Sequence, residues 1–221
     1  ADLVIAVLGE TSNMSSENAS RATLDLPGIQ QQMLETAVAS GKPVVLVLES
    51  GRPLDIRWAS QHVPAILESW YSGTQGGNAV ADVLFGIADP AGRLPITFPM
   101  AEGQLPLVYD HTPTGRGDDY ADLTGQPLFP FGFGLSYPTF EYSALTISPD
   151  SIVAGAGARV ACRVKNTGTR AGDEVVQLYI HDELASVARP VMQLAGFARV
   201  HLAPGDAREV TFSLTDAQLG L

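Results

Sequence analysis

The chain has 221 residues, which is enough for one large or two ordinary domains. Hydrophobic residues make up 45% and charged residues 17%, a composition typical of a core-forming globular protein and not of a disordered one. The formal net charge of -11, from 13 Lys and Arg against 24 Asp and Glu, would repel a phosphate backbone, which excludes nucleic acid as an expected partner.

Two unbroken apolar runs in the first fifty residues predict strands. Residues 3–8 and residues 43–48 show no alternation between apolar and polar side chains, which is typical of strands buried on both faces of a parallel sheet. Residues 65–70 predict a third strand of the same kind. Such a sheet is thin, so we expect further strands before Ala1, and we interpret Ala1 as a cut or processed start.

Helices are predicted between and after these strands. Pro27 and Gly41 bracket residues 28–40, where one side carries the apolar residues that packing on a sheet requires: Ile29, Met33, Leu34 and Val38. A short helix is predicted from residue 53 to about residue 60, and a third over residues 77–85. Strands that alternate with helices predict an α/β sheet with helices on its faces.

The second half of the chain has a different character. Glycine, proline and scattered aromatic residues from residue 89 to about residue 138 predict an irregular wrapping segment. From about residue 140, apolar residues alternate with polar ones, which predicts a small antiparallel β-sandwich with Cys162 inert in its core. Little chain follows Leu214, so we expect this sandwich to lack a strand.

The cysteine and the histidines give no metal-ligand pattern. Cys162 is the only cysteine and cannot form an internal disulfide. The four histidines are far apart in the sequence and lack metal-ligand spacing: His62, His111, His181 and His201. No apolar run approaches the length of a membrane span, and no signal peptide is visible. We therefore expect no cofactor, no metal and no membrane partner.

The polar loop over residues 9–21 is the strongest candidate for chemistry. It follows the first predicted strand, and ligands of parallel sheets gather beyond the carboxyl ends of strands. It carries two carboxylates, Glu10 and Glu17, with Arg21 four residues after the second. A carboxyl group there could donate or accept a proton, although a solvated or locally paired Glu is the more frequent case on residue types alone.

Four motifs cover nearly the whole chain: Ser16-Glu17-Asn18-Ala19-Ser20-Arg21 after a strand ending Gly9-Glu10, then residues 68–79, 89–95 and 129–137. Together, and in this order, they resemble landmarks of glycoside hydrolase family three, the family of bacterial β-glucosidases. The resemblance implies the C-terminal portion of such an enzyme. We accordingly expect an α/β sandwich domain over residues 1–100 without its N-terminal part, a wrapping segment over residues 101–139, and a fibronectin type III-like (immunoglobulin-like) β-sandwich over residues 140–221.

The resemblance also implies the chemistry of the loop. Retaining glycosidases use one carboxylate as nucleophile and another as acid and base. In this family the nucleophile is an aspartate on a preceding (β/α)8 barrel, so only the acid/base is expected here, and Glu17 matches its position. Glu10 lies tight against the strand end. Because an ion pair would oppose the protonated form of Glu17, we expect Arg21 to serve the loop backbone or another carboxylate.

Other residues near the loop keep two interpretations. Met14, Ser16 and Arg21 are candidates for substrate binding, although packing within the loop is the more frequent role for Met14 and Ser16. Trp70 could stack on a sugar or fill the core. The glycine-rich turn over residues 73–78 lacks the Lys-Ser/Thr pair of a phosphate-binding loop, which disfavours a nucleotide-binding function.

The resemblance implies a retaining exo-β-glucosidase that hydrolyses terminal non-reducing β-D-glucosyl residues, with a noncatalytic carbohydrate-binding or scaffolding module as the alternative. The expected partners are a β-linked oligosaccharide or aryl glucoside substrate and the barrel that supplies the nucleophile. A homodimer is one option for assembly. We expect a periplasmic or secreted protein, with the cytoplasm as the alternative.

Overall fold

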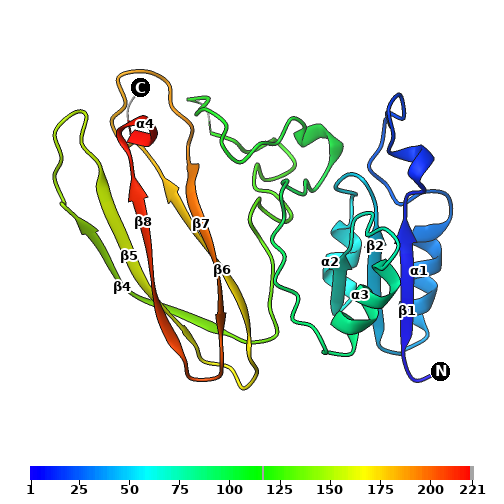
Figure 1. The fold of residues 1–221 in the computed structure, drawn as a ribbon. Helices are drawn as coiled ribbons and strands as arrows, with labels where there is room; N and C mark the ends of the chain where they lie inside the picture. Colours follow the sequence, from blue (N-terminus) through cyan, green and yellow to red (C-terminus); the bar gives the residue numbers. More distant parts are fainter. Residues whose placement is uncertain (116, 220–221) are drawn as a thin grey trace. The chain divides into compact units, whose positions relative to one another are not determined.

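The computed structural model describes residues 1–115 and 117–219, which fall into two compact units (Figure 1). The first unit contains the described residues of Ala1–Phe85, Ile96–Val108 and Arg116–Phe131. The second contains the described residues of Gly86–Pro95, Tyr109–Gly115 and Gly132–Leu221. A parallel sheet with helices is thus followed by antiparallel sheets, which confirms the predicted fold class. Within the described residues, no helix has the length and apolar character needed to cross a membrane.

A three-stranded parallel sheet organises the first unit. Its strands lie in the order β1-β2-β3 in the sheet, and a helix follows each strand in the chain. The elements in chain order are β1 (Val4–Gly9), α1 (Gln30–Ala39), β2 (Val44–Glu49), α2 (Arg57–His62), β3 (Ala65–Glu68) and α3 (Gly76–Leu84). In the sheet register, Leu48 lies opposite both Leu8 and Glu68. The carboxyl ends of all three strands therefore meet at one edge of the sheet.

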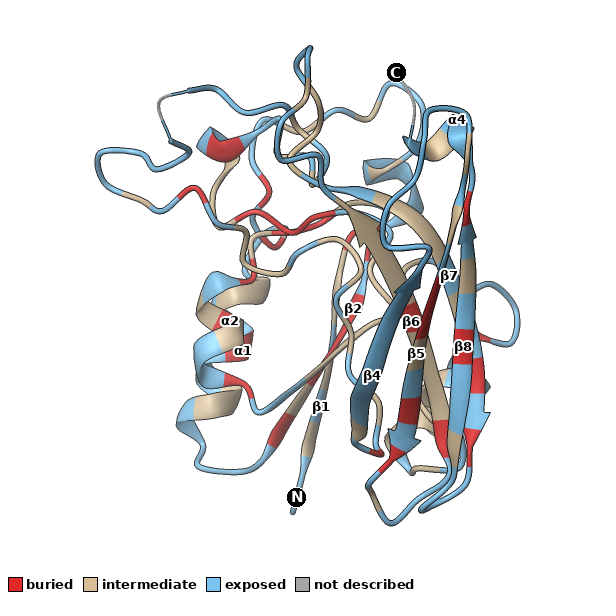
Figure 2. Ribbon diagram, turned by 90° about the vertical axis from the view of Figure 1, so that its left-hand side faces the viewer, coloured by how far each residue is buried: buried red, intermediate tan, exposed pale blue. Residues whose placement is uncertain are grey.

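The central strand β2 is the most deeply buried. Its residues Val44, Leu46 and Leu48 are at most 2% exposed, whereas Ile5 and Val7 of β1 are 42% and 55% exposed. Figure 2 shows the same contrast along the two strands. The prediction that residues 3–8 are buried on both faces is therefore wrong for β1, because β1 is an edge strand of the described sheet and one of its faces is open.

The helix α1 buries a narrower stripe than predicted. Leu34 is fully buried, but Ile29 is 65% and Met33 is 54% exposed, so the prediction that these two residues pack on the sheet is wrong. Ile29 precedes the first helical residue, and Met33 is turned by about 100° from Leu34 around the helix axis. The second helix also begins later than predicted, at Arg57.

A two-layer β-sandwich forms most of the second unit. Its layers are the sheet β4-β5-β8 and the pair β6-β7, all antiparallel: β4 (Phe140–Ser148), β5 (Ala158–Asn166), β6 (Gly172–Ile180), β7 (Gln193–Leu202) and β8 (Ala207–Leu214). The short helix α4 (Asp216–Leu219) follows β8. The core contains apolar residues from both layers: Val164, Val176, Val200, Leu202 and Val210.

Cys162 packs against this core, as predicted. It is partly buried, and burial raises the pKa of its thiol. A raised pKa reduces the thiolate fraction at neutral pH, so a structural role fits this cysteine better than a reactive one.

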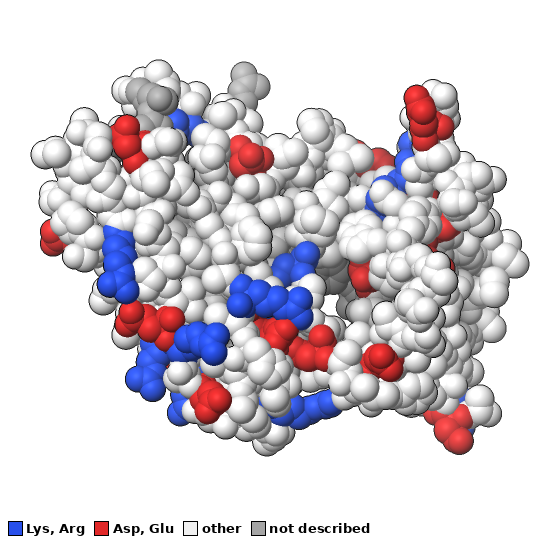
Figure 3. Space-filling model, in the orientation of Figure 1, with Lys and Arg blue, Asp and Glu red and all other residues white. Residues whose placement is uncertain are grey.

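The motif over residues 89–95 belongs to the second unit and attaches to the start of β6. The Asp89 carboxylate accepts hydrogen bonds from the backbone N–H groups of Tyr137 at 2.8 Å and Asp173 at 3.0 Å. Arg93 forms an ion pair of 3.0 Å with Glu174. Figure 3 shows basic and acidic side chains side by side on the lower part of the sandwich. The described contacts give this motif a structural role.

Aromatic residues of the irregular segment also have core contacts. Phe129 lies edge to face against Phe98, with 6.4 Å between the ring centroids, and Phe98 is 1% exposed. These two residues form an isolated antiparallel bridge, and the short 3-10 helix η2 (Glu102–Gln104) follows Phe98 in the chain. For Phe129 these contacts favour a role in anchoring the segment to the core over stacking on a sugar.

Candidate active site

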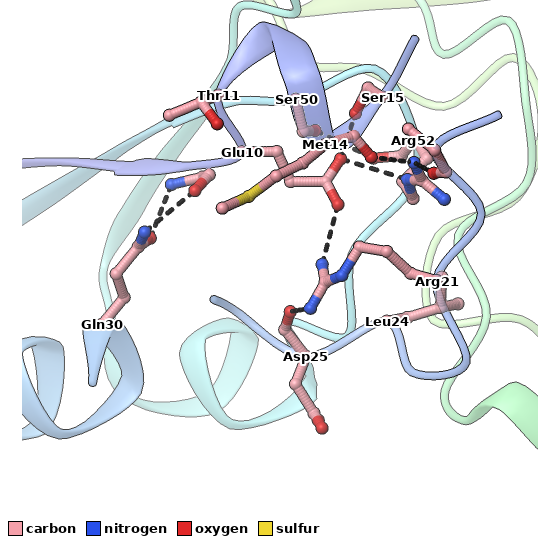
Figure 4. A network of polar contacts seen from close by, with 12 residues as sticks. Glu10, Thr11, Met14, Ser15, Arg21, Leu24, Asp25, Gln30, Ser50 and Arg52 are labelled. Carbon is pink, nitrogen blue, oxygen red and sulfur yellow. Dashed lines mark hydrogen bonds and ion pairs between the residues drawn. The ribbon is translucent and has the colours of Figure 1, made fainter. Parts of the chain in front are cut away.

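The first strand ends in a tightly held glycine. Gly9 has φ 139°, and an added Cβ would lie 2.0 Å from the carbonyl oxygen of Glu49. Its N–H donates to Oε1 of Gln30 at 2.7 Å, and its carbonyl accepts from Nε2 of Gln30 at 2.9 Å (Figure 4). The start of the loop is thereby fixed to both β2 and α1.

Glu10 is the centre of a buried charge cluster directly after this glycine. Its side chain is 0% exposed, and its two carboxylate oxygens face different arginines. Arg21 Nη1 lies 2.7 Å from Oε1, and Arg52 Nε lies 3.1 Å from Oε2. The hydroxyl of Ser15 donates to the same Oε2 (Figure 4). Both lone-pair sides of the carboxylate therefore have donors, as a buried charge requires.

These contacts determine the charge state of Glu10. Burial by itself would raise the pKa of Glu10, but the hydrogen bonds from Ser15 and Arg21 and the charge of Arg52 outweigh it, and the pKa is lowered. Glu10 is therefore a carboxylate at neutral pH and has no proton to donate. Its contacts assign it to the structure of the loop and not to general acid catalysis.

Glu17 lies in a turn and has a different environment. The N–H of Ala19 donates to the carbonyl of Ser16 at 3.0 Å, which closes a turn with Glu17 and Asn18 at its centre. Asn18 has φ 63°, a left-handed conformation that asparagine tolerates better than most residues. Glu17 is exposed, so its carboxyl group is accessible to a ligand from outside the chain.

Arg21 binds Glu10 and not Glu17. Its Nη2 also donates to the carbonyl of Asp25 at 2.8 Å. The prediction that Arg21 serves the loop backbone or another carboxylate is therefore confirmed. The guanidinium of Arg21 is thus engaged at two points, and its side chain is 20% exposed. Substrate binding by Arg21 stays a prediction.

The other predicted loop residues have mixed environments. Met14, in the 3-10 helix η1 (Ser12–Met14), is 37% exposed, and its carbonyl accepts a hydrogen bond from Arg52. Ser16 is exposed and contributes the carbonyl that closes the turn. Their backbones thus hold the loop, and their side chains remain candidates for substrate contact.

Two residues that contact the backbone of this loop, one after the second strand and one after the third, were missed from the sequence. Arg52 follows β2 and donates through Nη2 to the carbonyls of Met14 and Ala19, the latter at 2.9 Å. Tyr71 follows β3, and its hydroxyl lies within hydrogen-bonding distance of the carbonyl oxygens of Thr11, at 3.1 Å, and Glu10, at 3.3 Å. The sequence could have indicated both residues, because the carboxyl ends of neighbouring parallel strands meet at one edge of the sheet and each residue follows such an end.

Glu68, the last residue of β3, is a partly buried residue at this edge. Its Oε1 accepts the N–H of Trp70 at 3.0 Å, while its buried Oε2 has no hydrogen-bond partner among the described residues. Burial raises the pKa of Glu68 to about 7, against a smaller opposite effect of the Trp70 N–H. The Trp70 ring lies 6.1 Å from the ring of Phe98, which favours the core interpretation of Trp70 over sugar stacking.

Within residues 1–115 and 117–219, no group of three or more His, Cys, Asp or Glu side chains is arranged to hold a metal ion. Glu10 is ionised and enclosed, whereas Glu17 is open to a ligand.

Comparison with known proteins identifies the family. Residues 1–137 match the glycosyl hydrolase family 3 C-terminal domain, and residues 174–221 match a fibronectin type III-like domain. The first match covers more than half of the chain, so the chain belongs to glycosyl hydrolase family 3, as the four motifs predicted.

Relatives of this chain include named glycosidases. It is 44% identical over 97% of its length to a periplasmic beta-glucosidase of Salmonella typhimurium, covering 29% of that protein. It is 43% identical over its whole length to a beta-xylosidase of Formosa agariphila, covering 31% of that protein. The crystal structure of a beta-glucosidase from Listeria innocua in complex with glucose matches with a TM-score of 0.93 and 37% identity, over 98% of this chain and 32% of that one. The chain thus spans about a third of the length of such relatives.

Proposed function

We propose that this chain is the acid/base-bearing part of a retaining exo-β-glucosidase that hydrolyses terminal non-reducing β-D-glucosyl residues. An aspartate on a (β/α)8 barrel outside this chain would act as nucleophile. The observation that carries the proposal is the contrast between the two loop carboxylates. Glu10 is ionised and enclosed by arginines, whereas Glu17 is exposed in a turn whose sequence matches the family's acid/base loop.

In this mechanism Glu17 acts twice. It donates a proton to the glycosidic oxygen while the aspartate attacks the anomeric carbon, so the leaving alcohol departs neutral and a glycosyl ester forms. The resulting Glu17 carboxylate then removes a proton from water as that water attacks the anomeric carbon. The ester bond breaks, the aspartate is released, and glucose leaves with its configuration retained.

Aryl glucosides with different leaving groups test this assignment. Glu17→Gln should lower kcat/KM for phenyl β-glucoside by about a hundredfold or more, because phenoxide needs a proton to leave. The same change should hardly affect kcat/KM for dinitrophenyl β-glucoside, whose leaving group is stable as an anion. Phenyl β-xyloside is measured in parallel, because the Formosa agariphila relative is named a beta-xylosidase.

Azide rescue gives a second test. In a Glu17→Ala enzyme, azide should accelerate turnover of dinitrophenyl β-glucoside and yield β-glucosyl azide, since it attacks the glycosyl ester without needing a base. The matched control is Glu35→Gln, because Glu35 is an exposed carboxylate on α1 whose described contact is a hydrogen bond from Gln31. Wild-type kinetics in the Glu17 variants would refute the assignment.

A noncatalytic carbohydrate-binding or scaffolding module is the second candidate, since the nucleophile lies outside this chain. Intact-protein mass spectrometry of the native protein separates the two. A polypeptide that carries the barrel supports the enzyme, whereas a species of 23.3 kDa that cleaves no glycoside supports the module. We also propose a periplasmic or secreted location, supported by the Salmonella typhimurium relative, which is named periplasmic.

A further inference from the structure

The turn that carries Glu17 is held at both ends by one side chain. Arg52 donates through the same nitrogen, Nη2, to the carbonyl of Met14, before the turn, and to the carbonyl of Ala19, after it. Its Nε is paired with the buried Glu10 at 3.1 Å. A single guanidinium therefore joins the entry and the exit of the turn to a fixed buried charge (Figure 4).

The backbone of Arg52 is also held in place. The buried hydroxyl of Ser50 donates to the carbonyl of Arg52 at 2.8 Å, and the side chain of Arg52 is 23% exposed. An added Cβ on the preceding Gly51 would lie 2.7 Å from Cβ of Ser15 and 3.0 Å from a ring carbon of Tyr71. The loops after β1, β2 and β3 are thus in direct contact at this point.

Tyr71 supports the first part of the same loop. Its hydroxyl lies within hydrogen-bonding distance of the carbonyls of Thr11 and Glu10. The segment from Glu10 to Ala19 is therefore held by Arg52 from the second strand loop and by Tyr71 from the third. Glu17 is exposed, so the position of its carboxyl group depends on the backbone that these two residues hold.

We propose that Arg52 and Tyr71 are positioning residues for proton transfer by Glu17: they hold the backbone of the loop that carries it and do not contact the substrate themselves. This inference rests on the proposed function of Glu17. Proton donation requires the carboxyl group within hydrogen-bond reach of the glycosidic oxygen, and a displacement of about 1 Å can cost about a hundredfold in rate.

Arg52→Lys in the full-length enzyme tests the proposal. A lysine keeps the charge beside Glu10, but it lacks the planar set of donors that contacts the carboxylate and two carbonyls together. We expect kcat/KM for phenyl β-glucoside to fall by about a hundredfold, while kcat/KM for dinitrophenyl β-glucoside hardly changes. Both values report formation of the glycosyl ester, and only the first depends on the proton.

Tyr71→Phe keeps the test decisive if Arg52→Lys does not fold. It removes the hydroxyl that donates to the loop carbonyls and keeps the ring beside Gly51. We therefore expect kcat/KM for phenyl β-glucoside to fall by less than in Arg52→Lys, again with little change for dinitrophenyl β-glucoside. Arg57→Lys is the matched control, because Arg57 is an exposed arginine in the same unit, 4.0 Å from its carboxylate partner Asp55. We expect wild-type kinetics from it with both substrates.

The outcomes separate this inference from the proposed function. Equal losses with both substrates, or no loss with either, would overturn the positioning role, since a general loss of structure or substrate binding does not distinguish leaving groups. Azide rescue of Glu17→Ala tests the acid/base role independently. If rescue occurs and the substrate split in Arg52→Lys and Tyr71→Phe does not, only the positioning role fails.

Discussion

The carboxyl group of Glu68 should make the first unit less stable as the pH rises from about 4 to 8. The pKa of Glu68 is about 7 in the folded chain, against an ordinary value of 4.5. Below pH 4.5 both the folded and unfolded chains hold the proton. Between the two values only the folded chain holds it, so stability falls as the pH rises, and above pH 7 the full cost is present.

The size of this cost follows from the difference between the two pKa values and amounts to about 3 kcal/mol. Its cause is the burial of the carboxyl group, whose Oε2 has no described hydrogen-bond donor when the group ionises. Glu68→Gln has nearly the same shape and does not ionise. The variant should therefore gain about 3 kcal/mol relative to wild type on going from pH 4 to pH 8.

Urea unfolding at the two pH values, followed by tryptophan fluorescence, measures this difference. The chain has two tryptophans, Trp58 and Trp70, and both lie in the first unit, so the signal reports on the unit that contains Glu68. Any constant effect of the new amide cancels between the two pH values. Glu35→Gln is the control, and we expect its effect to differ by less than about 0.5 kcal/mol between them. A Glu68→Gln effect that is equal at pH 4 and pH 8 would refute the reasoning.

Three further predictions concern stability and reactivity. Glu10→Gln should destabilise the first unit by about 3 kcal/mol at neutral pH, because Arg21 and Arg52 lose their shared counter-charge. Urea unfolding measures this loss, and an unchanged unfolding midpoint would contradict the buried charge cluster. Gly9→Ala should lower the free energy of unfolding by about 3 kcal/mol or more, because the φ of 139° disfavours alanine and the carbonyl of Glu49 leaves no room for a Cβ. A melting temperature within a degree or two of wild type would be inconsistent with this. Cys162 should react slowly with a thiol reagent in the native chain and much faster in urea, since burial raises its pKa; equal rates would show that it is not packed against the core.

The fold class followed from periodicity, but the burial of single residues did not. An apolar run predicts a strand, yet it does not say whether the strand is central or at an edge, so Val7 is 55% exposed while Val47 is 1% exposed. The strand β7 was not predicted, although Ala198, Val200 and Leu202 alternate with polar residues. Gly196 interrupts the apolar pattern near its start, where the pairing register shifts.

The candidate site was predictable in part for a similar reason. The contacts of Arg21 with the loop backbone and with another carboxylate than Glu17 followed from local sequence and charge, because Arg21 and Glu10 lie within one loop. The role of Glu17 stays a prediction. Arg52 lies 42 positions from Glu10 in the sequence, and only the pairing of β1 with β2 brings the two together. The raised pKa of Glu68 was also not predictable, since it depends on how far the folded chain buries this carboxyl group.

A general acid must be accessible to its substrate and also hold its position, and these needs oppose each other in a surface loop. An exposed side chain has few contacts of its own that could fix it. In this chain other side chains hold the loop backbone in place. Two arginines keep the Glu10 carboxylate ionised, and Arg52 and Tyr71 donate hydrogen bonds to carbonyl groups of the loop. The residues on which proton transfer depends most are therefore expected to include ones that never touch the sugar. It follows that the kinetic effect of a substitution near this loop should depend on its hydrogen bonds to the loop backbone, and not on its distance from the substrate.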